Sequence, residues 1–139
     1  MQTATVVTIE TKINASIDKV WKYWTEPDHI TKWCQASDDW HAPYAENELK
    51  EGSKFKTTMA ARDGSVSFDF EGTYDKIFQP NVLEYTIADG RKVKIAFQEE
   101  GTATKVTESF ETESMNPVEM QRAGWQAILD NFKKYVEAN

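Results

Sequence analysis

Glu108 is the residue of this chain whose type and position point most clearly to chemistry. The alternation that places Val106 and Phe110 on the inner face of a predicted strand also places this carboxylate there. A buried carboxylate either has a raised pKa or finds a hydrogen-bond donor, and both are typical of a pocket that positions a polar ligand group. Two structural alternatives stay open: an internal ion pair with Arg122, or a bulge that turns Glu108 outward. We expect Glu108 to contact a ligand or an ordered water cluster, and it is a candidate catalytic residue.

His41 is the second candidate for acid-base chemistry, because it follows two aspartates and Trp40 in an irregular segment expected at the pocket mouth. The alternative is a surface histidine satisfied within its own loop, since no nucleophile or second histidine accompanies it at motif spacing. His29 is expected to be solvated. Two histidines and Cys34 lack the spacing of a zinc site, so we predict no metal. No hydrolase elbow, phosphate-binding loop or dinucleotide fingerprint is present, and no cofactor is predicted.

Length and composition limit the number of domains, the partners and the location that we expect for this protein. The 139 residues fit one domain over 1–139, without a linker or a repeat. A net charge of −7 argues against binding to nucleic acid or to anionic lipid. The single cysteine excludes an internal disulfide, and without an apolar leader or span we expect a cytoplasmic location and no membrane partner. Five Trp, five Tyr and seven Phe are enough to line a cavity as well as to fill a core, although filling the core is the simpler interpretation.

The element expected to organise the others is a long amphipathic helix over 116–136. Asn116 is predicted as its N-cap, Pro117 as its first residue, and Glu119 as the side chain that reaches back to the cap. Met115 and Met120 have the spacing of a hydrophobic staple. Its apolar face carries Val118, Trp125, Ile128, Leu129, Phe132, Tyr135 and Val136.

The rest of the chain predicts a sheet for this helix to pack on. A strand over 3–13 precedes two short helices, over 17–24 and over 27–34, and a brief strand over 40–45 lies within the irregular segment 35–52. Period-two patterns then predict a meander of strands over 55–61, 66–74, 83–87, 93–97 and 106–110. The predicted fold is α+β, a curved antiparallel sheet of about six to seven strands wrapped round the C-terminal helix. A pocket is expected at the gap near the short helices and the irregular segment.

Two glycines are expected to serve packing. Gly72 interrupts a strand where a bulge or bend would help the sheet curl. Gly124 lies inside the long helix, where it costs roughly 1 kcal/mol relative to alanine. Close approach of the sheet, or space for a ligand, would compensate for that cost.

Several motifs along the chain together form a known pattern. They are Ile13 to Trp21, Thr25 to Pro27, Ile30 to Trp33, Gly52 to Phe55, Phe70 to Gly72, Gly101, Thr102, Val106, Thr107, Gly124, Trp125, Leu129 and Tyr135. In these residues the chain resembles the START-like or SRPBCC superfamily, whose helix-grip fold is that of the birch-pollen allergen (Bet v-like). Within it the resemblance is to the branch of the activator of heat-shock-chaperone ATPase homologues (AHSA-like). It covers essentially the whole chain and implies a fold more strongly than a function.

The resemblance implies binding of a small apolar or aromatic molecule in a cavity between sheet and helix. A cyclase-like or isomerase-like enzyme is the alternative, in which Glu108, His41 or Tyr85 would transfer protons. A chaperone-binding or other protein-interaction module is the third; the co-chaperone members carry an additional amino-terminal domain, and a polar outer sheet face counts against this role. A chaperone partner and a homodimer both stay open. The expected ligand-binding residues are Trp33, Trp40, His41, Phe55, Met59, Phe68, Phe70, Tyr85, Phe97, Glu108, Met120, Gln121 and Trp125.

Overall fold

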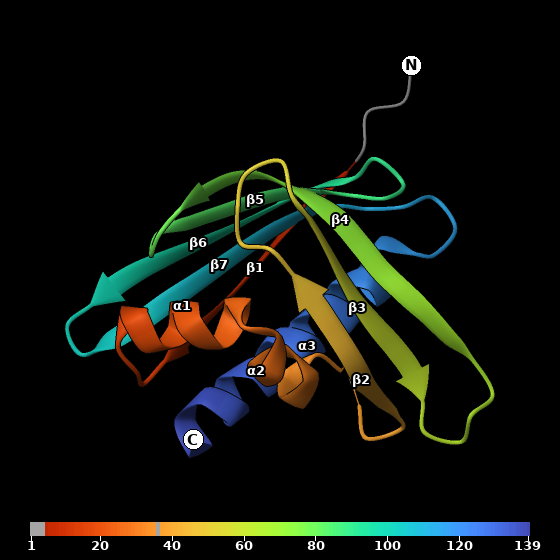
Figure 1. Cartoon of the computed structure of the whole chain (residues 1–139), viewed down its shortest axis with the longest axis horizontal. Helices are drawn as coiled ribbons and strands as arrows, with labels where there is room; N and C mark the ends of the chain where they lie inside the picture. The colour runs from red at the N-terminus through yellow and green to blue at the C-terminus, as the bar shows by residue number, and fades with distance from the viewer. Residues whose placement is uncertain (1–4, 36) are drawn as a thin grey trace.

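A curved sheet of seven antiparallel strands lies over a long C-terminal helix in the computed structural model, which describes residues 5–35 and 37–139 (Figure 1). The strand order is β1-β7-β6-β5-β4-β3-β2, so consecutive strands from β2 to β7 are neighbours and β1 joins at the β7 edge. The helix-grip prediction is confirmed. The elements are β1 (Val6–Ile13), α1 (Ile17–Thr25), α2 (Pro27–Trp33), β2 (Trp40–Asn47), β3 (Lys54–Ala61), β4 (Ser67–Phe78), β5 (Val82–Ile87), β6 (Lys92–Glu100), β7 (Ala103–Glu111) and α3 (Val118–Ala138).

The core lies between the concave face of the sheet and α3. Alternate residues of β7 point inward, so that Val106 and Phe110 are fully buried. From the helix side, Leu129, Phe132 and Val136 are also fully buried. Burial of apolar surface on the concave face of the sheet and on the inner face of α3 stabilises the packing of this helix against the sheet.

The two short helices close one end of this arrangement (Figure 1). Ser16 caps α1, its Oγ accepting a hydrogen bond from the Lys19 amide at 3.3 Å. Pro27 starts α2, and the α2 residue Trp33 donates from Nε1 to the Tyr23 carbonyl at 2.9 Å. The Asn131 side chain then donates to the Trp33 carbonyl at 2.7 Å, so α2 is tied to α1 and to α3.

The N-terminus of α3 differs from its prediction. The helix begins at Val118 with Pro117 as N-cap, and the Asn116 side chain donates to Glu113 Oε1 at 2.9 Å instead of capping the helix. Glu113 also accepts hydrogen bonds from the Met115 amide at 2.7 Å and the Asn116 amide at 3.1 Å, so its carboxylate organises this loop. The predicted capping box and staple are therefore wrong, and Glu119 pairs with Arg122 at 3.5 Å while Met115 and Met120 are 87% and 63% exposed.

Gly72 acts differently from its prediction, and for Gly124 one of the two predicted explanations is removed. The register shift in β4 lies between Tyr74 and Lys76, not at Gly72. A Cβ on Gly72 would lie 2.6 Å from Phe55 Cζ and 2.7 Å from the Thr86 carbonyl, so glycine makes room for the Phe55 ring on the sheet. A Cβ on Gly124 would meet no atom within 4 Å, so close approach of the sheet does not explain that glycine.

Three further boundaries differ. The predicted first strand started at Thr3, which lies outside the described residues, and β1 begins at Val6. β2 extends to Asn47, two residues beyond the predicted strand, and pairs with β3, so a larger part of the segment 35–52 is strand than the sequence predicted. Val66 precedes β4 and is 49% exposed. Within residues 5–35 and 37–139, no helix has the length and apolar composition needed to cross a membrane.

Candidate functional site

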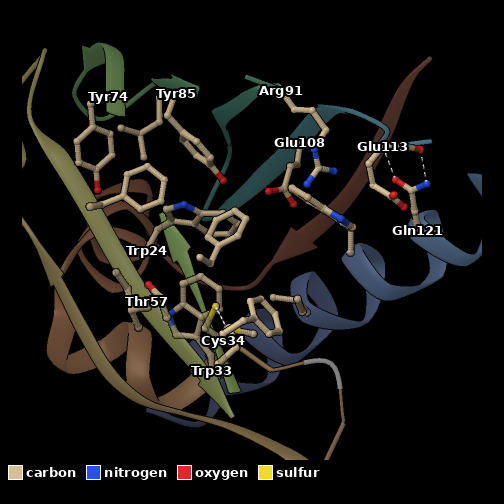
Figure 2. Close-up of a pocket in the computed structure, with 18 of the residues that line it drawn as sticks. Trp24, Trp33, Cys34, Thr57, Tyr74, Tyr85, Arg91, Glu108, Glu113 and Gln121 are labelled. Carbon is tan, nitrogen blue, oxygen red and sulfur yellow. Dashed lines mark hydrogen bonds between the residues drawn. The ribbon is translucent and has the colours of Figure 1, made fainter. Parts of the chain in front are cut away.

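A pocket of about 370 Å³ lies between α2, strands β3 to β5 and the first half of α3 (Figure 2). This volume falls in the range typical of small-molecule sites. Its walls come from elements far apart in the sequence, which only the curvature of the sheet brings together. The lining residues are Trp24, Ile30, Trp33, Cys34, Phe55, Thr57, Met59, Phe68, Phe70, Tyr74, Leu83, Tyr85, Arg91, Glu108, Glu113, Asn116, Gln121, Trp125 and Ile128.

Aromatic rings in mutual contact form one wall of the pocket. The Phe55 ring meets the Tyr85 ring edge-on at 4.8 Å between centroids, and the Phe70 ring meets Trp125 in the same way at 6.2 Å. Trp125 is itself stacked on Phe110 at 4.0 Å, which fixes the indole against the sheet. This wall is therefore held in place by core packing and is present before any ligand arrives.

Glu108 on β7 supplies a buried carboxyl group to this pocket. Its neighbours in the sheet are Ile9 on β1 and Ile95 on β6, and its side chain is on the inner face with only 5% of the residue exposed. Neither structural alternative holds, because β7 keeps its register here and Arg122 contacts Glu119 and the Thr8 carbonyl instead. Within residues 5–35 and 37–139 the carboxyl group forms no ion pair, and burial is the only cause of its pKa shift, with no contribution from a hydrogen bond.

Burial raises the pKa values of Glu108 and of the titratable groups around it. Desolvation raises the pKa of Glu108 to about 8, so the carboxyl group is mostly protonated at neutral pH. Burial, and then the charge of Glu108, raises the pKa of the Cys34 thiol to about 12 and that of Tyr85 well above its usual value. Figure 2 shows the Tyr85 hydroxyl and the Glu108 carboxyl group pointing into the same space. The Cys34 thiol donates to Met59 Sδ at 3.7 Å and is an unreactive wall group.

The opposite end of the pocket is polar and belongs to the loop before α3 (Figure 2). Gln121 joins this loop to the helix, its Oε1 accepting from the Glu113 amide at 3.0 Å and its Nε2 donating to the Asn116 carbonyl at 2.8 Å. Arg91 lies between Glu108 and this loop in Figure 2 and is held by Asp89, with Nε 2.9 Å from Oδ2 and 3.1 Å from Oδ1. The hydrogen bond from Asn116 is the main cause of a lowered Glu113 pKa.

The structure brings most of the predicted binding residues into the pocket. Phe97 does not line it, because its ring is 2% exposed and packs between Trp21 and Trp24 at 5.5 and 5.9 Å. Met120 points to solvent and His41 lies on β2 outside the lining, so their expected places at the pocket are wrong. The residues that do line it are Trp33, Phe55, Met59, Phe68, Phe70, Tyr85, Glu108, Gln121 and Trp125.

Trp40 also lies outside the lining, although its ring contacts that of Phe68 edge-on at 5.9 Å. Phe68 is 50% exposed and therefore lies at the rim. His29 is not solvated as predicted, because its ring stacks on Tyr23 at 3.9 Å and its Nδ1 is 2.7 Å from the Tyr135 hydroxyl. The described residues contain no group of three or more histidine, cysteine or acidic side chains that could hold a metal ion.

Some lining residues were missed although the sequence carried a signal for them. The spacing that predicted the short helices also places Trp24 and Ile30 inward, and strand alternation does the same for Tyr74 and Leu83. Arg91, Glu113 and Asn116 lie in a turn and a loop, where no periodicity predicts the direction of a side chain. Thr57, Cys34 and Ile128 complete the set.

The arrangement of sheet, closing helix and pocket defines a START-like protein with the helix-grip fold. The profile of the family described as "Activator of Hsp90 ATPase homolog 1-like protein" matches residues 14–137. The chain therefore belongs to this family. No protein with a curated description matches the sequence.

Solved structures agree with this assignment. The AHSA1-like protein from Aeromonas hydrophila is 43% identical, with a TM-score of 0.91 over 96% of this chain and 93% of that one. Chr148 from Cytophaga hutchinsonii is 57% identical, with a TM-score of 0.82 over 95% and 92% of the two chains. Protein NE0264 from Nitrosomonas europaea, at 18% identity and a TM-score of 0.83 over 96% and 94%, shows the likeness of fold alone. This fold commonly binds ligands or interacts with other proteins.

Proposed function

We propose that the protein binds a small, largely apolar or aromatic molecule in the pocket between the sheet and α3. The observation that carries the proposal is the pocket itself, about 370 Å³ in volume, with an aromatic wall and with most of its polar side chains gathered toward the loop before α3. Burial of the apolar surface of a ligand against Phe55, Phe70 and Trp125 would drive association. The family name refers to activation of the Hsp90 ATPase, and the pocket is what favours ligand binding over that role for this chain.

A binding assay with a neutral apolar dye tests the proposal. N-phenyl-1-naphthylamine fluoresces more strongly in an apolar site, and we expect a saturable rise with one site per chain. Ile128 lines the pocket from α3, so Ile128→Phe should fill part of the volume and weaken dye binding severalfold. Ile77→Phe is the matched control, because Ile77 is also half-buried but lies outside the lining, and it should leave the affinity unchanged.

Native mass spectrometry of freshly purified protein is the complementary measurement. An added mass that is lost on mild activation, and lost from Ile128→Phe but not from Ile77→Phe, would identify a ligand carried from the cell. A clean apo mass together with unsaturable dye fluorescence would contradict ligand binding. Both variants should retain the circular dichroism of the parent protein, so that loss of binding is not loss of fold.

A cyclase-like or isomerase-like activity is the second candidate, and Glu108 is the observation that favours it. A carboxyl group with a pKa near 8 exchanges its proton readily at neutral pH, as a general acid or base must. If a ligand is recovered from the pocket, chromatography after incubation with the protein would reveal an isomer of it. An unchanged ligand after many hours would leave binding as the function.

A further inference from the structure

The Glu108 carboxyl group has no ion-pair partner among the described residues. It is 5% exposed and faces the pocket (Figure 2). Arg91 is drawn beside it in this view but forms its ion pair with Asp89, and no cation of the described part of the chain lies within ion-pair distance of Glu108. Nearby protein cations normally lower the pKa of a buried carboxyl group, and here only desolvation acts on it. The group is therefore available to a cation brought by a ligand.

The walls beside Glu108 also suit a positive charge. Trp125, Phe70, Tyr85 and Phe55 form a continuous aromatic surface in the pocket, with Phe70 6.5 Å from Tyr85 between ring centroids. The faces of such rings are electronegative and attract cations, most strongly when water is excluded. An anionic ligand would gain nothing from them.

The other titratable groups around the pocket leave its charge balance negative. Arg91, from the turn before β6, is paired with Asp89 and also acts on Glu113. The phenols of Tyr74 on β4 and Tyr85 on β5 and the thiol of Cys34 after α2 are neutral at physiological pH, and burial raises their pKa values further. The α3 side chains in the lining, such as Gln121, carry no charge, and the whole chain has a net charge of −7 that attracts cations.

We propose that the ligand of this pocket is an organic amine, whose ammonium group pairs with Glu108 while its apolar or aromatic body lies against Phe55, Phe70 and Trp125. This inference rests on the proposed ligand binding and specifies its chemistry. A neutral ligand with a carbonyl group would use Glu108 as a protonated hydrogen-bond donor instead, and the pH dependence of binding separates the two. An ammonium ion requires the ionised carboxylate, so its affinity should rise with pH up to about 8 and then level off.

Three probes of one shape and different charge test the proposal. Tryptamine is a cation at neutral pH, tryptophol is its neutral alcohol, and indole-3-acetate is its anion. By isothermal titration calorimetry we expect tryptamine to bind roughly tenfold or more tightly than tryptophol, and indole-3-acetate to bind most weakly. Tryptamine binding should release a proton below about pH 8, visible as a dependence of the heat on buffer ionisation.

Glu108→Gln keeps the size of the side chain and removes its charge. It should abolish the preference for tryptamine and its pH dependence while leaving tryptophol binding intact, which also shows that the variant is folded. Glu99→Gln is the control for net charge, because Glu99 is exposed and lies outside the pocket, and it should retain the preference.

The outcomes separate this inference from the proposal on which it rests. Equal affinities for the three probes, tighter binding of indole-3-acetate, or affinity for tryptophol that falls with rising pH would overturn the amine while leaving a ligand pocket. Binding of the naphthylamine dye without binding of any indole probe would also overturn the amine and leave a ligand pocket. An ordinary Glu108 pKa in the free protein, measured by carboxyl NMR, would show that Arg91 already neutralises it and would also overturn the inference. Failure of both dye and probes would contradict the pocket as a binding site altogether.

Discussion

Glu108 should make the folded protein less stable as the pH rises, which is the reverse of the effect of a carboxyl group whose pKa is lowered on folding. Its pKa is about 8 in the folded protein and near 4.5 when solvated, so the folded state binds a proton that the unfolded state has released between these values. The stabilisation is complete below about pH 4.5 and is lost as the pH rises to about 8. Because exposed carboxylates titrate too, the informative quantity is the difference between the wild type and Glu108→Gln.

That difference gives the first prediction. Between about pH 5 and pH 8 the wild type should lose a few kcal/mol of unfolding free energy relative to Glu108→Gln. Urea unfolding of both proteins across this range measures it, with Glu99→Gln as the control that should run parallel to the wild type. If the difference in unfolding free energy between the wild type and Glu108→Gln did not change with pH, the carboxyl group would have to be solvated or paired.

Cys34 provides a second prediction at the same scale. Its thiol has a pKa of about 12 because burial disfavours the thiolate, which is the form that reacts with alkylating agents. Iodoacetamide at mildly alkaline pH should therefore modify native protein far more slowly than protein unfolded in urea, followed by mass spectrometry. A bound ligand should slow the reaction further, since Cys34 lines the pocket. Native labelling as fast as that of the unfolded chain would place the thiol outside the pocket.

At the scale of the elements, the two internal glycines predict opposite effects of the same substitution. Gly124→Ala should stabilise the protein by roughly 0.5 to 1 kcal/mol, because alanine favours the helix and a Cβ there meets no atom within 4 Å. Thermal or urea unfolding measures the change. A destabilised Gly124→Ala would indicate that something occupies the space beside this turn of α3.

Gly72→Ala should destabilise the protein by about 1 to 3 kcal/mol, because the added Cβ would lie 2.6 Å from the Phe55 ring and 2.7 Å from the Thr86 carbonyl. The carbonyl belongs to the backbone of β5 and gives way less easily than the ring. Since Phe55 is part of the pocket wall, dye binding should weaken in the same variant. Unchanged stability and binding would show that the ring is free to move away.

The elements also show where sequence reasoning succeeds and where it fails. Period-two alternation predicted strands β3 to β7 and the inward direction of Glu108, because one face of the sheet must be covered. The start of α3 was misplaced because Glu113, a loop residue, competes for the amides and for Asn116, and no spacing rule detects such a competitor. At the polar end of the pocket only Gln121 was predicted, and Arg91, Glu113 and Asn116 were missed because no periodicity governs the turn and the loop that carry them.

Across the whole molecule, the composition predicted that aromatic residues would be numerous enough to line a cavity and to fill a core, and the structure divides them between these tasks. Phe97 and Phe132 are buried in the core, whereas Phe55, Phe70 and Trp125 line the pocket. The sequence made this division correctly for Phe55, Phe70 and Trp125 but not for Phe97, because strand alternation predicts that a side chain points inward and not whether it meets the pocket or the core.

The most direct test of the central claim is to locate a bound molecule by NMR. In a complex with N-phenyl-1-naphthylamine, intermolecular nuclear Overhauser effects should connect the dye to methyl groups that line the pocket, those of Ile30, Met59, Leu83 and Ile128. Methyl groups outside it, such as that of Ile77, should show none. Contacts confined to the outer face of the sheet, or to the exposed Met115 and Met120, would contradict a binding site between the sheet and α3.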